Sequence, residues 1–305
     1  MPIALAVDLG GTKVEAALVR DDGTIVPGTR ARAATGRHAS VDDLDAAVAD
    51  VVARCRASEA WSEVIAAGIG SAGPIDLGAG TVSPVNLPGS AGLPLVDIVR
   101  RRSGLERVEM RLDGTCIALA ELSWGAARGS RNAIVIVVST GVGGGIVSDG
   151  RLVAGHSGNA GHIGQIVIGH DADDDGTVEG IASGPRTVAW ARLQGWTGDT
   201  GEELAASYAA EDPLARASVA RSANAVGVGL VNAATLLDLD LAVIGGGFSF
   251  VAEDYPAQVA SAVRAHAVHD YAARLAVVRA QLGGDAPLVG AAALVHRPEL
   301  LGPSI

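Results

Sequence analysis

A carboxylate followed by a glycine turn stands near the start of the chain. Glycine tolerates positive φ and has no Cβ, so such a turn can bring several backbone N–H groups onto one phosphate group. The carboxylate is suited to holding Mg²⁺ through water, because this ion prefers one or two carboxylates and keeps much of its hydration. The turn also offers a hydroxyl donor and a lysine, which fits either a phosphate contact or a solvated position. The residues of this candidate nucleotide site are Asp8, Gly10, Gly11, Thr12 and Lys13.

Two more glycine clusters follow predicted strands, at residues 139–145 and 245–247. Neither the turn at Asp8 nor the one at residues 139–145 matches a P-loop or opens a helix, as a dinucleotide-binding turn must. In isolation each is an ordinary hairpin. Their recurrence after strands favours a nucleotide site, where the third cluster lets adenine or ribose approach the backbone. The residues expected to contact nucleotide here are Thr140, Gly141, Gly143, Gly245 and Gly246.

Short aliphatic runs alternate with helical patterns along the chain, which is typical of mixed α/β layers. The predicted strands are Ile3 to Asp8, Ala16 to Val19, Val64 to Ile69, Ala133 to Ser139, Gly145 to Ser148, Leu241 to Ile244 and Ala276 to Ala280. The predicted helices are Val41 to Ser58, Thr115 to Ala127, Pro185 to Gln194, Leu214 to Leu237, Tyr255 to Ala267 and Pro287 to Val295.

A unit of strand, glycine turn and returning strand occurs twice, with its turn at residues 8–12 and again at residues 139–145. This repeat predicts two domains, an N-terminal α/β domain over residues 1–112 and a larger C-terminal α/β domain over residues 113–286. A length of 305 residues is sufficient for two cores of ordinary size.

The composition excludes several classes of protein. The net charge is −11 and Lys13 is the only lysine, so we expect no nucleic-acid partner. Cys55 and Cys116 are too few for a disulfide framework and suit a reducing cytoplasm. The N-terminus lacks the pattern of a signal peptide, and glycines interrupt the apolar runs, so we also expect no membrane span.

Several motifs, in order along nearly the whole chain, resemble those of ROK (repressor, open reading frame, kinase) family sugar kinases, and the chain looks like a glucokinase-like variant. These motifs are Leu5 to Val19, Gly68 to Pro74, Asn86 to Pro88, Ser139 to Gly145, Val243 to Gly247 and Leu282 to Leu294. The resemblance implies a two-domain actin-like ATPase (ribonuclease H-like) fold with an interdomain cleft. It also implies ATP and Mg²⁺ as cofactors, a sugar substrate, a homodimer, and packing of the last helix, residues 287–305, on the first domain.

The resemblance also assigns roles to single residues. Asp113 matches the family's general base, although Leu112 and Thr115 stand where the family has Asn. The family's Glu and His that hold sugar hydroxyls appear as His162 and Gln165. A pocket built for particular hydroxyls rejects analogues that leave polar groups unpaired, so these changes leave the sugar open. The residues expected to bind substrate are Asn86, Asp113, His162, Gln165 and Glu179.

The structural zinc of many family members is not expected here. Its His and three Cys ligands are replaced, and zinc would lack its thiolates. The four positions are Gln165, His170, Ala172 and Thr177. The same loop carries acidic residues from Asp171 to Glu179, which begin like a calcium loop but have Ala182 at the twelfth position, so a solvated acidic turn is favoured over a cation site.

The resemblance therefore predicts ATP-dependent phosphorylation of a sugar hydroxyl with Asp113 as general base. The alternative is a noncatalytic sensor of sugar or nucleotide, which the altered pocket favours and the intact glycine turns oppose. The family's repressor branch places a DNA-binding domain ahead of the kinase-like part. Because this chain begins directly with the first strand, we do not expect that branch.

Overall fold

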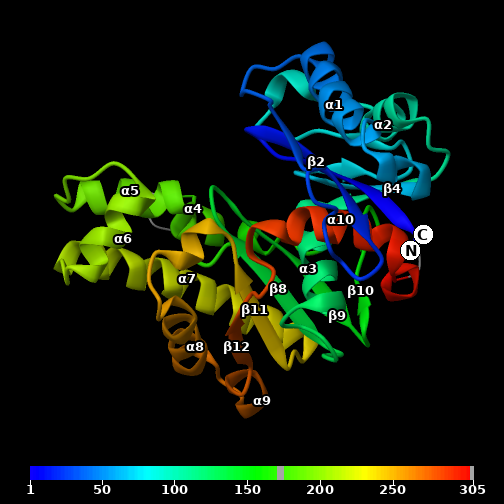
Figure 1. The fold of residues 1–305 in the computed structure, drawn as a ribbon. Coiled ribbons are helices and arrows are strands. Elements are labelled where there is room, and N and C mark those ends of the chain that lie inside the picture. Colours follow the sequence, from blue (N-terminus) through cyan, green and yellow to red (C-terminus); the bar gives the residue numbers. More distant parts are fainter. Residues whose placement is uncertain (170–174, 303–305) are drawn as a thin grey trace. The chain divides into compact units, whose positions relative to one another are not determined.

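The computed structural model describes residues 1–169 and 175–302, which fold into two compact units of mixed α/β structure (Figure 1). Unit 1 comprises Met1–Arg128, Arg151–Ala160 and Gly284–Ile305. Unit 2 comprises Gly129–Gly150 and Gly161–Gly283. The sequence places the first boundary at residues 112 and 113, whereas the structure places it after the helix that begins at Asp113, because that helix packs within unit 1.

Unit 1 is built on a five-stranded sheet of order β3-β2-β1-β4-β7, in which β1 is antiparallel to β2 and parallel to β4. Its strands are β1 (Ile3–Leu9), β2 (Lys13–Arg20), β3 (Ala31–Ala34), β4 (Val64–Ser71) and β7 (Val108–Leu112), with β5 (Ile75–Asp76), β6 (Thr81–Val82) and β10 (Arg151–Leu152) outside this sheet. Its helices are α1 (Val41–Arg56), α2 (Leu95–Ser103), α3 (Asp113–Trp124) and α10 (Ala286–His296).

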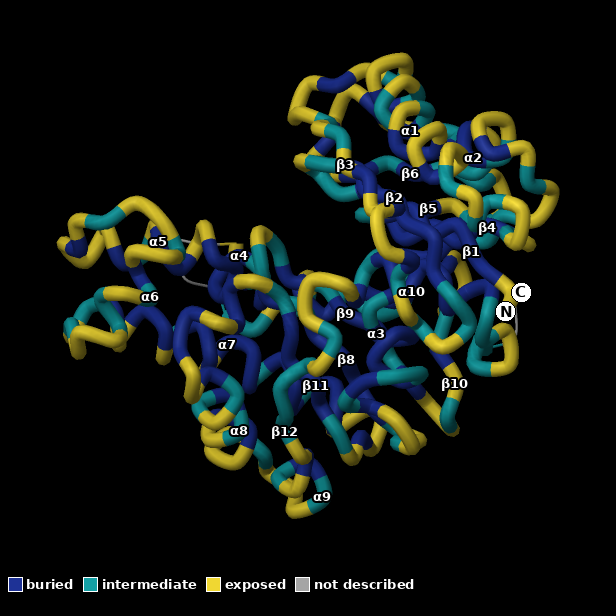
Figure 2. The backbone as a smooth tube through the Cα atoms, viewed as in Figure 1, coloured by how far each residue is buried: buried dark blue, intermediate teal, exposed yellow. Residues whose placement is uncertain are grey.

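The two faces of this sheet differ in side-chain size. Along β1, Ile3, Leu5 and Val7 join the large apolar core that includes α1 and α2. Ala4 and Ala6 point to the opposite face, where they pack against α10. Because successive strand residues alternate between faces, Asp8 follows Ala4 and Ala6 onto the face of α10. All of β1 is buried, and β4 is buried from Ala66 to Ser71 (Figure 2).

Small residues let α10 approach the strands and α3 very closely. A Cβ on Gly68 in β4 would lie 1.8 Å from the backbone oxygen of Ala291, and a Cβ on Gly290 would lie 1.9 Å from that of Cys116. These distances are far below any real contact, so only glycine fits at either position. This close packing fixes α3, and with it Asp113, against the sheet.

Unit 2 repeats the strand–turn–strand plan. Within it, β9, β8, β11 and β12 lie in that order, with β8 antiparallel to β9 and parallel to β11. Its strands are β8 (Ala133–Val138), β9 (Val142–Ser148), β11 (Leu241–Gly245) and β12 (Ala276–Arg279). Its helices are α4 (Val178–Ala182), α5 (Gly184–Leu193), α6 (Gly201–Ala209), α7 (Pro213–Leu237), α8 (Tyr255–His266) and α9 (Asp270–Ala273). The long helix α7 packs against α4, α5, α6 and α8 over one apolar core.

Every strand and helix predicted from the sequence is present, with small shifts at the ends. Among the helices of the described residues, none combines the length and the apolar character that crossing a lipid bilayer requires.

The close approach at Gly68 gives a test of this packing. Gly68→Ala is expected to lower the free energy of unfolding by about 3 kcal/mol or more, because the added methyl group must displace the backbone of α10. Gly284→Ala is the matched control in unit 1, since a Cβ there meets nothing within 4 Å. Urea denaturation of both variants measures the difference, and equal small losses would contradict the packing described.

Candidate active site

Asp8 is the buried carboxylate at the centre of the candidate site in unit 1. It stands near the end of β1, is only 8% exposed, and lies directly opposite Glu15 in the antiparallel pair of β1 and β2. Gly70 on the neighbouring strand lies close to it, since a Cβ there would be 3.4 Å from both the Asp8 Oδ1 and the Cys116 Sγ. Asp8 is therefore packed between β4 and α3 on this face.

Burial and neighbouring charges raise the pKa of Asp8 to about 7. Desolvation is the largest cause, followed by the Asp113 carboxylate; Lys13 lowers the pKa, Glu15 raises it and Arg30 lowers it. The strand register places both carboxylates at the same edge of the sheet, because Asp8 pairs with Gly70 on β4 and Gly70 pairs with Arg111 on β7, two residues before Asp113. A carboxylate in this position gains from a cation that lowers the cost of its negative charge, so the site fits a hydrated Mg²⁺.

The turn after Asp8 is a tight hairpin between β1 and β2. The Gly10 N–H donates to the Lys13 carbonyl oxygen at 2.9 Å, and Thr12 is exposed at the tip. Asn86 lies beside the turn, since a Cβ on Gly11 would come within 2.9 Å of the Asn86 Cβ. The structure thus brings the nucleotide residues predicted in unit 1 together with Asn86, one of the predicted sugar residues.

Asp113 is the first residue of α3 and is half-buried. The helix N-cap is Leu112, so Asp113 does not occupy the capping position that an aspartate before a helix usually takes. The Gly114 N–H donates to the Asp113 Oδ1 at 2.7 Å. This contact with the backbone of the first turn orients the carboxylate at the helix N-terminus.

The corresponding turn of unit 2 joins β8 to β9. The Ser139 N–H donates to the Gly141 carbonyl oxygen at 2.8 Å, and Thr140 is exposed. Glu179 supports this turn from α4, because its Oε2 accepts a 2.8 Å bond from the Val142 N–H. A Cβ on Gly141 would lie 2.6 Å from the same oxygen.

The predicted sugar residues of unit 2 are only partly brought together. The Gln165 Nε2 donates to the Glu179 Oε1 at 3.2 Å. His162 stands at the N-cap of the 3₁₀ turn Ile163–Gln165. Glu179 thus contacts both the predicted sugar residue Gln165 and the glycine turn, a double role that the sequence does not show.

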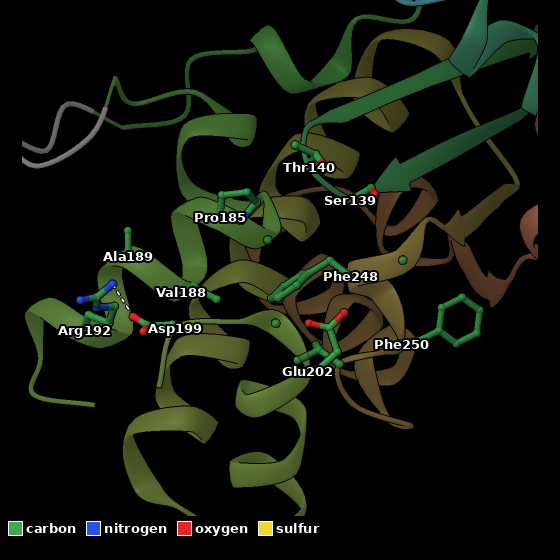
Figure 3. A pocket seen from close by; sticks show the side chains of 14 residues that line it. Ser139, Thr140, Pro185, Val188, Ala189, Arg192, Asp199, Glu202, Phe248 and Phe250 are labelled. Atoms are coloured by element: carbon green, nitrogen blue, oxygen red, sulfur yellow. Dashed lines mark ion pairs between the residues drawn. The ribbon is translucent and has the colours of Figure 1, made fainter. Parts of the chain in front are cut away.

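A cavity of about 640 Å³ lies in unit 2 beside this turn (Figure 3). Ser139 and Thr140 line it from the β8–β9 turn, and Gly247 and Phe248 line it after β11. Gly246 has a φ of 89°, and a Cβ there would lie 2.4 Å from the Val138 carbonyl oxygen, so only glycine permits this close turn. Gly245 is the last residue of β11, and Gly143 is the second residue of β9.

The cavity has an apolar wall and a charged rim. Figure 3 shows Val188 and Phe248 on the wall, Glu202 beside Phe248, and Arg192 paired with Asp199. The Arg192 guanidinium lies 2.6 Å from the Asp199 carboxylate. Val188 and Arg192 come from α5, Asp199 and Glu202 from the start of α6 and the residues before it, and Phe248 from the turn after β11. None of these side chains was predicted from the sequence. The size and lining suit a nucleoside.

Within residues 1–169 and 175–302, no group of three or more His, Cys, Asp or Glu side chains is placed to hold a metal ion. Of the positions matched to zinc ligands, Gln165 bonds Glu179, and the Thr177 hydroxyl caps α4 by accepting from the Gly180 N–H. His170, Ala172 and most of the acidic run, Asp171, Asp173 and Asp174, lie outside the described residues. The predicted lack of structural zinc stays a prediction.

The ROK family model matches residues 4–298, almost the entire chain. The chain belongs to the ROK family. It is 31% identical to a glucokinase of Streptomyces coelicolor over 322 aligned positions, covering 98% of this chain and 99% of the relative. An N-acetylmannosamine kinase of Yersinia pseudotuberculosis is 34% identical over 255 positions, covering 79% of this chain and 82% of the relative.

A solved structure of a ROK family glucokinase from Streptomyces griseus, in complex with glucose and AMPPNP, superposes with a TM-score of 0.82. It is 30% identical and covers 96% of this chain and 98% of that chain. The family resemblance inferred from the motifs is therefore confirmed, and so is the mixed α/β fold.

The raised pKa of Asp8 predicts a pH-dependent gain in stability on its replacement. The pKa of Asp8 is near 3.8 in the unfolded chain and about 7 in the folded protein. Between these pH values the folded wild type keeps a proton that the unfolded chain releases. The free energy of unfolding of the wild type therefore falls as the pH rises from about 4 to about 7. Asp8→Asn does not titrate. It is expected to raise the free energy of unfolding by roughly 2 kcal/mol at about pH 8 without magnesium, and by little at about pH 4. Denaturation curves at both pH values check this, and a gain independent of pH would contradict it.

Support of the β8–β9 turn by Glu179 predicts graded effects of two substitutions. Glu179→Ala leaves the Val142 N–H without its acceptor and is expected to weaken AMPPNP binding about tenfold, since a lost hydrogen bond costs about 1 to 2 kcal/mol. Glu179→Gln keeps one acceptor oxygen and should weaken binding less. Calorimetric titration measures both affinities. Equal losses in the two variants would show that the carbonyl oxygen does not replace the carboxylate in holding the turn.

Proposed function

We propose that the protein transfers the terminal phosphoryl group of ATP to a hydroxyl of a hexose or related sugar, with Asp113 as general base. The observation that carries the proposal is that the strand register of β1, β4 and β7 puts Asp8, the glycine turn after it and Asp113 at one edge of the unit 1 sheet. Membership of the ROK family and the glucokinase and N-acetylmannosamine kinase relatives support it.

In the proposed reaction the Asp113 carboxylate accepts the proton of the sugar hydroxyl. The hydroxyl oxygen forms a bond to the terminal phosphorus, and the bond from that phosphorus to the bridging oxygen breaks, which releases ADP. Mg²⁺ at Asp8, bound through water, would neutralise charge on the phosphate oxygens. The backbone N–H groups of Gly10 to Thr12 and Thr140 to Gly143 are proposed to hold the phosphates.

The two units are proposed to close on the substrates across an interdomain cleft, as in the actin-like ATPase architecture. Nucleoside binding is assigned to the 640 Å³ cavity of unit 2, next to Thr140 and Gly246. The proposal places the enzyme in the cytoplasm, where ATP is present and the buried thiols of Cys55 and Cys116 stay reduced. A homodimer is proposed from the family resemblance alone.

The sugar is decided by residues that differ from the family pattern. The Streptomyces and Yersinia relatives are named for different sugars, one as a glucokinase and the other as an N-acetylmannosamine kinase. Leu112 and Thr115 flank Asp113, and both are buried, while His162 and Gln165 replace the family's Glu and His. Asn86, His162, Gln165 and Glu179 are proposed to bind the hydroxyls of the sugar.

A noncatalytic sensor on the same scaffold is the second candidate. The observation that favours it is that both Glu179 oxygens already accept hydrogen bonds, from Val142 and Gln165. A carboxylate engaged in this way has less capacity left for sugar hydroxyls.

A substrate panel separates the two functions. Hexoses, amino sugars and polyols are tested for sugar-dependent ADP release, with polyphosphate as an alternative donor. We expect turnover on at least one sugar, and Asp113→Asn should lower kcat by about 10³-fold or more, because the amide cannot accept the proton. AMPPNP binding serves as the control and should change little in the variant. Nucleotide binding without turnover on any sugar would favour the sensor.

A further inference from the structure

Lys13 is tied to a buried carboxylate on its own strand. Its Nζ lies 2.6 Å from the Oε2 of Glu15, which is 6% exposed. Residues 13 and 15 of β2 point to the same face as Asp8, because Asp8 and Glu15 are cross-strand partners. Lys13 is also the only lysine, while every other basic residue among the 23 Lys and Arg is arginine.

A second cation and a second anion extend this pair into a four-member network. The Arg30 Nε lies 3.7 Å from the Glu15 Oε1, and its Nη1 lies 2.6 Å from the Asp285 Oδ1. Arg30 also donates to the Gly284 carbonyl oxygen at 3.0 Å, just before α10. The two positive and two negative charges balance, which offsets part of the desolvation of the buried Glu15 carboxylate.

Stability alone does not account for an acidic residue at position 15. The face of β2 that carries Glu15 continues with Ala17 and Val19, which pack in the apolar cluster of α10. An apolar residue at position 15 would continue that cluster without the desolvation of a carboxylate. Glu15 also stands directly across the strand pair from the Asp8 carboxylate, and like charges in opposite positions are destabilising. A local choice that works against stability is expected where function requires it.

The Lys13 ammonium retains the capacity to bind a ligand. An ammonium has three N–H donors, and the bond to Glu15 uses one of them. The Lys13 side chain is 34% exposed, whereas that of Glu15 is 8% exposed, so a ligand has access to Lys13 but little access to Glu15. An arginine would present a longer planar fork in place of this compact charge.

We propose that Glu15 is a positioning residue, which holds the Lys13 ammonium against the phosphate oxygens of the nucleotide and is itself fixed by Arg30 and Asp285. The inference rests on the proposed kinase function. Glu15 touches no substrate and acts through Lys13. An ammonium fixed in advance binds phosphate without losing side-chain freedom on binding, so the loss of Glu15 should weaken nucleotide binding only while Lys13 is present.

A double-mutant cycle tests this dependence in the full-length protein. AMPPNP affinity with Mg²⁺ is measured by calorimetry for wild type, Lys13→Met, Glu15→Gln and the double variant. We expect Lys13→Met to weaken binding about 30-fold and Glu15→Gln about tenfold, in line with a charge-assisted hydrogen bond. The double variant should bind like Lys13→Met, because Glu15 has nothing left to position.

Two readouts separate positioning from a structural role. Asp50→Asn removes the exposed Arg54–Asp50 ion pair of α1 in the same unit, at 2.7 Å, and should leave affinity unchanged. The inference would be overturned if the double variant lost AMPPNP affinity by the product of the two single losses. It would also be overturned if Glu15→Gln lost thermal stability but kept the wild-type affinity. The cycle uses binding alone, so it stands even if no sugar is phosphorylated, a result that would contradict the proposed function instead.

Discussion

The alternation of side chains along β1, β2 and β4 is the constraint on which the site of unit 1 depends. One face carries Ile3, Leu5 and Val7 into a large core, and the other carries alanine, glycine and the polar groups. Because the side chains on that second face are small, α10 and α3 approach the strands closely. The buried carboxylates of Asp8 and Glu15 lie on this same face, directly opposite each other on β1 and β2.

Electrostatics then determines what such a face can do. Carboxylates without counter-charges would be costly there, and the raised pKa of Asp8 measures part of that cost. Lys13 and Arg30 offset the charge of Glu15 within the protein. The raised pKa of Asp8 shows that its negative charge is only partly compensated, and a magnesium ion would compensate it further. A carboxylate with such a shifted pKa is expected at a site that binds a charged ligand, as a phosphate-transfer site does.

The sequence predicted the local features of the fold and missed the relations between distant segments. Strong periodicity gave the strands and helices, and glycine after a strand gave both turns. The sequence did not identify β7 or α2, which are short and in which charged residues interrupt the apolar pattern. The boundary between the units differs from the predicted one because α3 packs on α10, a contact between distant segments that the local sequence pattern does not reveal. Glu15 was overlooked although its spacing from Lys13 places both on one strand face, and the cavity lining of unit 2 comes from segments far apart in the chain.

The central claim is that the glycine turns hold the phosphates while Asp113 faces the hydroxyl that is phosphorylated. A crystal structure with Mg²⁺, AMPPNP and an accepted sugar tests it most directly. The account predicts an Asp113 oxygen about 3 Å from one sugar hydroxyl, with that hydroxyl in line with the terminal phosphorus and both turns on the phosphates. A sugar bound with no hydroxyl near Asp113, or phosphates away from either turn, would contradict it.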